Sequence, residues 1–165
     1  MLSLRKYRQE DGHFIPAWFK DETEFRKWCI DRYEKYPVTA DDINRYYERC
    51  ANDNFCVFTA EDEGKVVGHM VMRVLDTEKP DIRFCLIVID GTIRGKGYGT
   101  AMLREAMDYA KDFLHAKTVS VGVFENNEAA YRCYIKLGFE ETGVTEEYDI
   151  MGEHWRYHIL SRQIH

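Results

Sequence analysis

Long apolar runs are missing from this 165-residue sequence. The longest purely apolar stretch, residues 84–89, is far shorter than the roughly 18 residues that a membrane-spanning helix needs. The first residues, MLSLRKYRQED, become charged within five positions, so we expect no secretion signal. These absences predict a cytoplasmic protein with no membrane partner.

Positive charge is also in short supply. Lys and Arg number 23 against 29 Asp and Glu, which leaves a net charge of -6. A chain of this charge repels a phosphate backbone on average, so we expect no nucleic-acid partner. A cationic or amine-bearing partner fits the charge better.

The cysteines lack the spacing of a metal site. There are five, scattered through the chain without a CxxC pair: Cys29, Cys50, Cys56, Cys85 and Cys133. Several lie inside apolar patterns, so we expect reduced, mostly buried side chains and no bound metal.

Internal repeats, low-complexity tracts and linkers are absent as well. The composition, 45% hydrophobic and 14% aromatic, is that of a chain with a packed core. Since the length suits one domain of ordinary size, we expect a single domain over residues 1–165.

The first third of the chain predicts a strand and two helices. Residues 2–7 are typical of an edge strand. Residues 11–49 are rich in charge and aromatics with helical spacing, and they predict two short helices, the second capped by Thr39 or Asp41.

The middle of the chain changes to a strand pattern. Residues 55–76 contain two β-rich runs joined by a turn at Gly64, which predicts an antiparallel hairpin. Residues 82–90, IRFCLIVID, are apolar on both faces, as in a central strand covered on both sides.

The remainder alternates between helix and strand. Residues 100–114 repeat apolar side chains at helical spacing, and residues 118–124 alternate like a strand. A further helix is expected to begin at Asn126 or Asn127 and to end at Gly138.

Two strand-like runs, residues 139–151 and 154–164, close the chain and are expected to pair antiparallel. The order of elements predicts an α/β fold with a mixed sheet and helices on both faces.

The stretch RGKGYG, residues 94–99, joins the apolar strand to the next helix. In such a turn the unpaired N–H groups of the first helical turn converge, and the helix dipole favours an anion there. The three glycines allow close approach of a diphosphate, and Arg94 and Lys96 add mobile positive charge. A plain connection with solvated cations is the alternative. The GxGxG spacing is neither the dinucleotide GxGxxG nor a Walker P-loop, so NAD and ATP are disfavoured.

Two segments of the chain resemble the GNAT superfamily of N-acetyltransferases. Arg94, Gly97 and Gly99 form RxxGxG, and NEAAYRCYIKLGF, residues 127–139, is similar to the NxxAxxxYxxxGF segment of that superfamily. The similarity covers roughly residues 82–139. The first 55 residues, which usually shape the acceptor site in this superfamily, carry no motif that aligns.

The resemblance implies a mostly antiparallel sheet in which two parallel strands, 84–89 and 118–123, splay apart around acetyl-CoA. It places the pantetheine arm along the first of these strands and the pyrophosphate at the glycine turn. The implied cofactor-binding residues are Ile87, Ile89, Arg94, Gly95, Lys96, Gly97, Tyr98, Gly99, Thr100 and Asn127. For Asn127, a plain helix cap is an equally economical interpretation.

The resemblance also implies that Tyr134 is the catalytic general acid toward the CoA sulfur; the alternative is a tyrosine packed on the sheet. Full proton transfer from a phenol of pKa about 10 to a thiolate of pKa about 8.5 is uphill by roughly 2 kcal/mol. We therefore expect Tyr134 to donate a hydrogen bond to the developing sulfur charge.

No general base is evident, because residues 84–89 contain no acid. Neutralising a lysine-like amine at pH 7 costs roughly 4.6 kcal/mol, against about 1 kcal/mol for a peptide α-amine, so low-pKa acceptors are favoured. His69, Glu125, Tyr148 and His154 are candidates to relay protons through water, although each is more simply a packed or solvated residue.

An acidic group, Asp21, Glu22 and Glu24, lies next to Trp18 and Phe19 in the sequence. Charge and ring faces together suit an acceptor cation. A solvated helix end is the plainer interpretation.

The resemblance implies an N-acetyltransferase that moves the acetyl group of acetyl-CoA to a primary amine of a small molecule or peptide by direct attack, and it is compatible with a homodimer. The missing strand carboxylate leaves open a non-catalytic CoA or acyl-CoA sensor module. The net charge leaves open, more weakly, a domain that recognises basic peptides.

Overall fold

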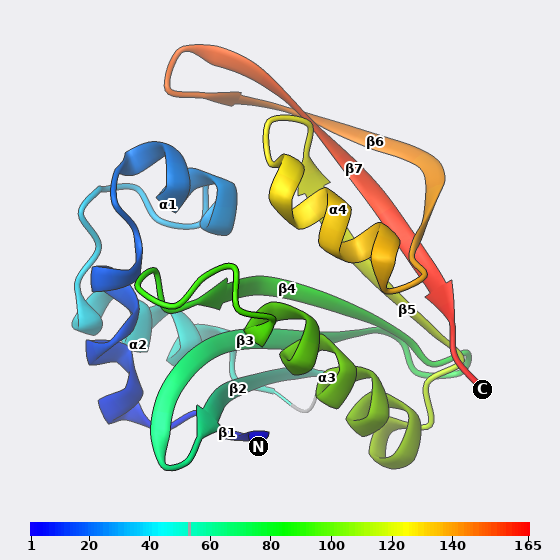
Figure 1. Ribbon diagram of the computed structural model, residues 1–165. Coiled ribbons are helices and arrows are strands. Elements are labelled where there is room, and N and C mark those ends of the chain that lie inside the picture. The colour runs from blue at the N-terminus through cyan, green and yellow to red at the C-terminus, as the bar shows by residue number, and fades with distance from the viewer. Residues whose placement is uncertain (53) are drawn as a thin grey trace.

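A seven-stranded mixed sheet forms the centre of the fold (Figure 1). The computed structural model describes residues 1–52 and 54–165. The strands lie in the order β1-β2-β3-β4-β5-β7-β6, and each neighbouring pair is antiparallel except β4 and β5. Their bounds are β1 (Leu2–Lys6), β2 (Phe55–Asp62), β3 (Lys65–Asp76), β4 (Asp81–Ile89), β5 (Thr118–Phe124), β6 (Glu140–Ile150) and β7 (Glu153–Gln163).

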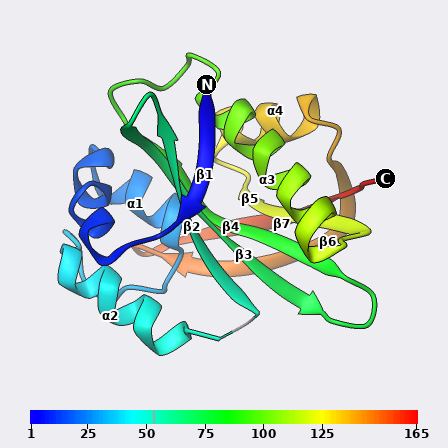
Figure 2. The ribbon, with the colours of Figure 1, turned by 90° about the horizontal axis from the view of Figure 1, so that it is seen from below.

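Helices cover both faces of this sheet (Figure 2). On one face, Phe25 and Ile43 of the first two helices pack in a core with Val71 of β3. On the other face, Leu103 and Tyr134 of the last two helices share a core with strand residues. The helices are α1 (Glu22–Cys29), α2 (Ala40–Cys50), α3 (Tyr98–Leu114) and α4 (Glu128–Lys136), and two short 3-10 helices, η1 (Gln9–His13) and η2 (Ile15–Trp18), precede α1. The predicted fold class is confirmed.

The parallel strands β4 and β5 are paired over only part of their length. Asp81 is opposite Thr118 and Phe84 is opposite Val121, and beyond that point no pairing between described residues joins the two strands. The separation confirms the predicted splayed pair.

A β-bulge in β4 accompanies the separation. His69 and Val71 of β3 face Val88 and Cys85 of β4, so β4 carries one extra residue there. Within it Leu86 adopts a φ of 51°, a left-handed conformation that is uncommon for a residue with a branched side chain. A bulge bends the strand that carries it. No glycine in the sequence marks this position.

The predicted elements of the first third are present with altered bounds. The edge strand β1 ends at Lys6, so Tyr7 lies outside it, and the Tyr7 hydroxyl donates instead to Asn44 Oδ1 at 2.6 Å. Of the two candidate caps of α2, Thr39 is the one that accepts a hydrogen bond, from the Asp42 N–H at 3.1 Å.

Several expectations for the later elements are confirmed. The β2–β3 hairpin turns at Gly64, which has a φ of 79°, and β6 and β7 pair antiparallel. Two helix bounds differ from the prediction: α3 begins at Tyr98, and α4 ends at Lys136, before Gly138 with its φ of 91°.

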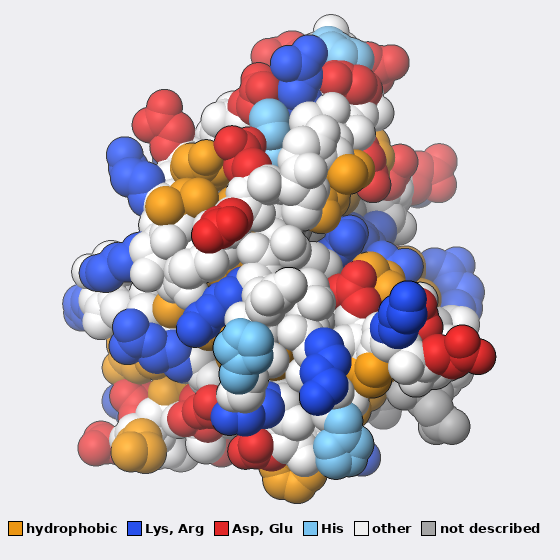
Figure 3. Space-filling view, turned by 90° about the vertical axis from the view of Figure 1, so that its right-hand side faces the viewer, with side chains coloured by type: hydrophobic (Ala, Val, Ile, Leu, Met, Phe, Trp, Pro, Cys, Tyr) orange, Lys and Arg blue, Asp and Glu red, His pale blue; other side chains and the backbone are white. Residues whose placement is uncertain are grey.

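The surface carries charges of both signs. On the side seen in Figure 3, acidic and basic side chains are interspersed. No helix in the described part of the chain is long and apolar enough to cross a membrane. No disulfide joins the described cysteines, of which Cys29 and Cys85 are buried and the other three half-buried.

Candidate active site

A cleft of about 520 Å³ opens where β4 and β5 separate. Residues 84–89 of β4 form one wall, and the starts of α3 and α4 form another. Side chains of α1, including Glu24 and Trp28, close its far side. The cleft therefore lies between the two strands that the family resemblance implied would part.

The glycine turn forms one end of the cleft. Gly95 and Gly97 adopt φ values of 78° and 86°, which a residue with a side chain reaches only with strain, and no described heavy atom outside the adjacent residues lies within 4 Å of a Cβ placed on either. Gly99 is helical, and its Cβ would meet Ile89 at 3.9 Å. The turn is thus open on the side where a ligand would approach.

The N-terminus of α3 is available for an anion. The N-cap residue is Gly97, which has no side chain to accept a hydrogen bond from the first turn. The first turn also contains no acidic residue. The N–H groups of the first turn have no intrahelical partner, and the helix dipole adds partial positive charge. This end of the cleft fits a diphosphate, as in acetyl-CoA.

Arg94 is held by the protein itself. Its guanidinium pairs with Glu24 at 2.7 Å and donates to the Trp18 carbonyl at 2.6 Å, and its Nε lies 3.2 Å from the Ile89 carbonyl. This differs from the mobile cation expected from the sequence. These contacts join α1 and the segment before it to the glycine turn, so Arg94 holds two walls of the cleft in place relative to each other.

The other predicted cofactor residues surround the same cleft with one exception. Lys96 is exposed and lies outside the described lining. Tyr98 donates its hydroxyl to Asp62 at 2.9 Å, and the Thr100 hydroxyl lies 3.6 Å from Cys133 Sγ. Asn127 caps α4 by accepting the Ala130 N–H at 3.4 Å, and it also lines the cleft, so both interpretations of Asn127 hold geometrically.

Tyr134 lies on α4 and reaches into the cleft. The residue is 6% exposed, and burial raises the pKa of its hydroxyl well above 10, with smaller contributions from Tyr157 and Cys133. A phenol in this state keeps its proton at neutral pH. Tyr134 is therefore a hydrogen-bond donor in the cleft.

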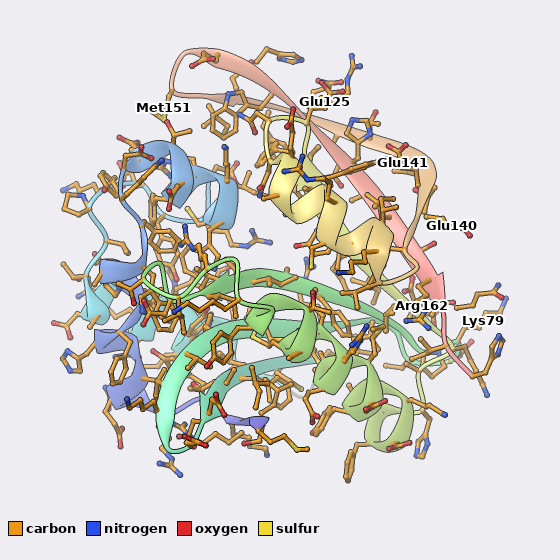
Figure 4. All side chains as sticks on the ribbon, in the orientation of Figure 1. Lys79, Glu125, Glu140, Glu141, Met151 and Arg162 are labelled. Carbon is orange, nitrogen blue, oxygen red and sulfur yellow. The ribbon has the colours of Figure 1, made fainter. Side chains whose placement is uncertain are left out.

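The candidate proton relays are engaged elsewhere. His69 is buried with Nε2 2.5 Å from the Tyr47 hydroxyl, and burial lowers its pKa to about 3. Glu125 lies on the outer side of the protein near Glu141 (Figure 4), where His158 bridges the two carboxylates at 2.8 and 3.0 Å.

The other two candidates lie on the β6–β7 hairpin. Tyr148 donates to Glu146 at 2.6 Å, and His154 contacts Glu147 and Asp149. Among the described residues that line the cleft, none of the four relay candidates is present.

The acidic group near Trp18 is internally satisfied. Asp21 accepts the Glu24 N–H and caps α1, Glu22 pairs with Arg26 at 3.3 Å, and Glu24 pairs with Arg94. These contacts favour the plainer interpretation of a helix end over a site for an acceptor cation.

Sequence reasoning missed Tyr157 on β7 and Gly122 on β5, which both line the cleft. The ring of Tyr157 lies across the backbone of Gly122. Tyr157 falls within the predicted strand 154–164, but the strand order that brings it beside the cleft is visible only in the fold.

The model of the acetyltransferase (GNAT) family matches residues 13–139. The chain belongs to the GNAT acetyltransferase family. The predicted enzyme class, an N-acetyltransferase with acetyl-CoA as cosubstrate, is confirmed by this match.

The relatives of this GNAT acetyltransferase include an N-acetylaspartate synthetase and a spermidine N(1)-acetyltransferase. The chain is 31% identical over 111 residues to the N-acetylaspartate synthetase of Xenopus tropicalis, a match that covers 67% of this chain and 40% of that protein. It is 25% identical over 154 residues to the spermidine N(1)-acetyltransferase of Escherichia coli, which covers 93% of this chain and 81% of that one.

The fold of this GNAT acetyltransferase is also that of a solved structure. The spermidine N-acetyltransferase of Vibrio cholerae, crystallised with CoA and spermine, superposes with a TM-score of 0.83 over 98% of this chain and 95% of that one, at 21% identity. At this identity the similarity establishes the fold.

Proposed function

We propose that this protein transfers the acetyl group of acetyl-CoA to a primary amine of a small molecule or peptide, by direct attack of the amine on the thioester. The observation that carries the proposal is the cleft between β4 and β5, which has the open glycine turn at one end and the Tyr134 hydroxyl on its wall. Named relatives act on a polyamine or make an N-acetylated amino acid, so an amine acceptor is common to both.

The residues divide into three roles in this proposal. Amides of the first turn of α3 bind the pyrophosphate, since the glycine turn leaves them open. The unpaired edge of β4 around Ile87 and Ile89 binds the pantetheine arm through its backbone. Tyr134 donates a hydrogen bond to the sulfur as negative charge develops on it.

A thiol-release assay on the full chain tests the proposal. With acetyl-CoA and a panel of primary amines of graded pKa, we expect release of CoA that depends on the amine, with mass spectrometry showing the acetylated product. Binding of acetyl-CoA without any acetylated amine would favour the sensor module instead. Absence of both binding and turnover would overturn the proposal.

We also propose that the chain forms a homodimer. The outermost strand, β6, is exposed along most of its length, and an exposed edge strand is a ready contact for a second copy. Light scattering would give the mass in solution, and a monomer mass would contradict this proposal. A single domain over residues 1–165 and a cytoplasmic location stay predictions.

A further inference from the structure

Three arginines, Arg32, Arg73 and Arg83, form a group that we call the arginine cluster. Arg73 of β3 and Arg83 of β4 are direct partners in the sheet register. The side chains of directly opposed residues project from the same face, and like charges in such a pair destabilise it. Arg83 also faces Ser120 of β5, and its Nε donates to Ser120 Oγ at 2.7 Å.

None of the three arginines forms an ion pair with a carboxylate within residues 1–52 and 54–165. All three are half-buried, and Arg32 donates to the Cys29 carbonyl at 3.3 Å. The chain contains 29 acids, so counter-ions are not scarce. Burial raises the pKa of the Asp81 carboxyl and the charge of Arg83, two residues along β4, partly offsets that rise, so one acid lies near the cluster without pairing with it. Half-buried guanidinium groups that form no ion pair leave room for an anion that comes from outside the chain.

Cys85 and Tyr157 link the arginine cluster to the cleft, because Cys85 lies two residues beyond Arg83 on β4 and so projects from the same face of the sheet. Both residues line the cleft. Burial raises the pKa of the Cys85 thiol, and the positive charges of all three arginines offset part of that rise. Burial likewise raises the pKa of the Tyr157 hydroxyl, and Arg32 and Arg83 offset part of it. Glu146 acts on Tyr157 in the opposite direction and less strongly.

The arginine cluster lies outside the described lining of the cleft but next to the point where β4 and β5 separate. Arg83 directly precedes Phe84, the last residue of β4 that pairs with β5 before the strands part. Its face of the sheet is the one that α1 and α2 cover, opposite to α3 and the glycine turn. An acceptor that enters from this face would meet the arginines beside the point where the strands separate.

Resting on the proposed function, we propose that the arginine cluster binds the carboxylate of the acceptor, so that the acceptor is an amino acid and not a polyamine. Guanidinium groups match carboxylates in a bidentate geometry, which would orient the amine toward the cleft. A polyamine carries several positive charges and is repelled by the same residues.

The cluster also bears on the missing general base. Nearby positive charge lowers the pKa of an ammonium group, because it disfavours the protonated form. When the carboxylate of the acceptor pairs with an arginine, its negative charge no longer stabilises the protonated amine of the same molecule. The arginine cluster thus helps to supply the neutral amine in a site whose central strand, at residues 84–89, carries no acid.

The test compares acceptors that differ only in the carboxylate. The full chain is assayed with acetyl-CoA and each of the twenty amino acids, with the primary amide of each active amino acid, and with spermidine. Loss of the carboxylate lowers the pKa of the amine toward the peptide value of about 7.7–8.0, so amine chemistry alone favours the amide. We expect the amino acid to have a kcat/KM at least about tenfold above that of its amide, and above that of spermidine.

Two variants locate the effect. Arg83→Gln and Arg32→Gln are each expected to raise the KM for the amino acid about tenfold or more while leaving the KM for acetyl-CoA unchanged. Arg45→Gln is the matched control, because Arg45 is an exposed arginine of α2 that pairs with Asp42. Melting curves establish whether each variant is folded. If Arg83→Gln does not fold, the KM values of Arg32→Gln test the inference.

The outcomes separate this inference from the proposed function. Acetylation of spermidine or of the amides without a preference for amino acids would overturn the inference and leave the acetyltransferase activity standing. An unchanged KM in both folded variants would do the same. A protein that neither binds acetyl-CoA nor acetylates any acceptor would overturn both.

Discussion

The ring of Tyr157 occupies the space that a side chain at Gly122 would need. A Cβ atom at position 122 would lie 2.0 Å from Tyr157 Cζ and 2.1 Å from its hydroxyl oxygen. The two residues belong to paired strands, β5 and β7, so neither backbone moves easily away from the other. Tyr157 can therefore lie beside the cleft only because residue 122 has no side chain.

The first prediction concerns this contact. Gly122→Ala is expected to lower the free energy of unfolding by about 1–3 kcal/mol, because an extra carbon forces the ring of Tyr157 from its position. Urea denaturation measures the loss. In the background of Tyr157→Ala the same substitution is expected to cost much less, and an equal cost in both backgrounds would show that the ring is not the cause.

The second prediction concerns the glycine turn. Gly97→Ala is expected to weaken acetyl-CoA binding about tenfold or more, measured by calorimetry, because a side chain at a φ of 86° disturbs the backbone that faces the diphosphate. The matched control is Gly64→Ala, at a φ of 79° in the β2–β3 turn, where no described heavy atom beyond its neighbours lies within 4 Å.

Both substitutions are expected to cost about 1–2 kcal/mol of stability from the left-handed conformation. Only Gly97→Ala changes acetyl-CoA binding if the turn holds the diphosphate. Equal affinities in the two variants would assign the pyrophosphate to another part of the cleft.

The third prediction concerns Tyr134. Replacing it with Phe keeps the ring and removes the donor, so we expect kcat to fall about 10- to 100-fold with little change in the KM for acetyl-CoA. Steady-state kinetics measure both constants. Tyr109→Phe serves as the control, because Tyr109 of α3 packs against Phe58 of β2 and is not among the described residues that line the cleft. Full retention of kcat in Tyr134→Phe would reduce its role to packing.

The fourth prediction concerns His69 and pH. Its pKa is lowered to about 3 in the folded protein, from about 6.5 in the unfolded chain, because burial disfavours the charged ring. Below pH 6.5 the unfolded chain therefore binds a proton that the folded protein does not, and stability falls as the pH falls. Between pH 6.5 and pH 4 this loss amounts to about 3 kcal/mol.

A variant without the titrating ring isolates the effect. His69→Gln retains an acceptor for the Tyr47 hydroxyl and is expected to show a flatter dependence of the unfolding free energy on pH between 6.5 and 4. His13→Gln, at an exposed position, is expected to follow the unsubstituted protein. Parallel curves for all three proteins would mean that His69 takes up its proton in the folded state.

Most helices and strands, and the glycine turn at one end of the cleft, could be predicted from local sequence alone. Amphipathic spacing at Leu103 and Ala106, the turn at Gly64 and a cap at Asn126 or Asn127 are local signals, because backbone conformation and side-chain period depend on a few neighbouring residues. The glycine turn belongs to this class as well, since the positive φ of Gly95 and Gly97 is a local requirement.

The long-range contacts around the cleft could be read only from the folded chain. The contacts there join residues far apart in the chain: Arg94 with Glu24, Tyr157 with Gly122, and Arg83 opposite Arg73. Such contacts depend on strand order and register. The bulge at Leu86 also depends on the register, and no glycine in the sequence indicates it. Local patterns specify how each segment folds, but which charges meet across the sheet is set by the packing of the whole chain.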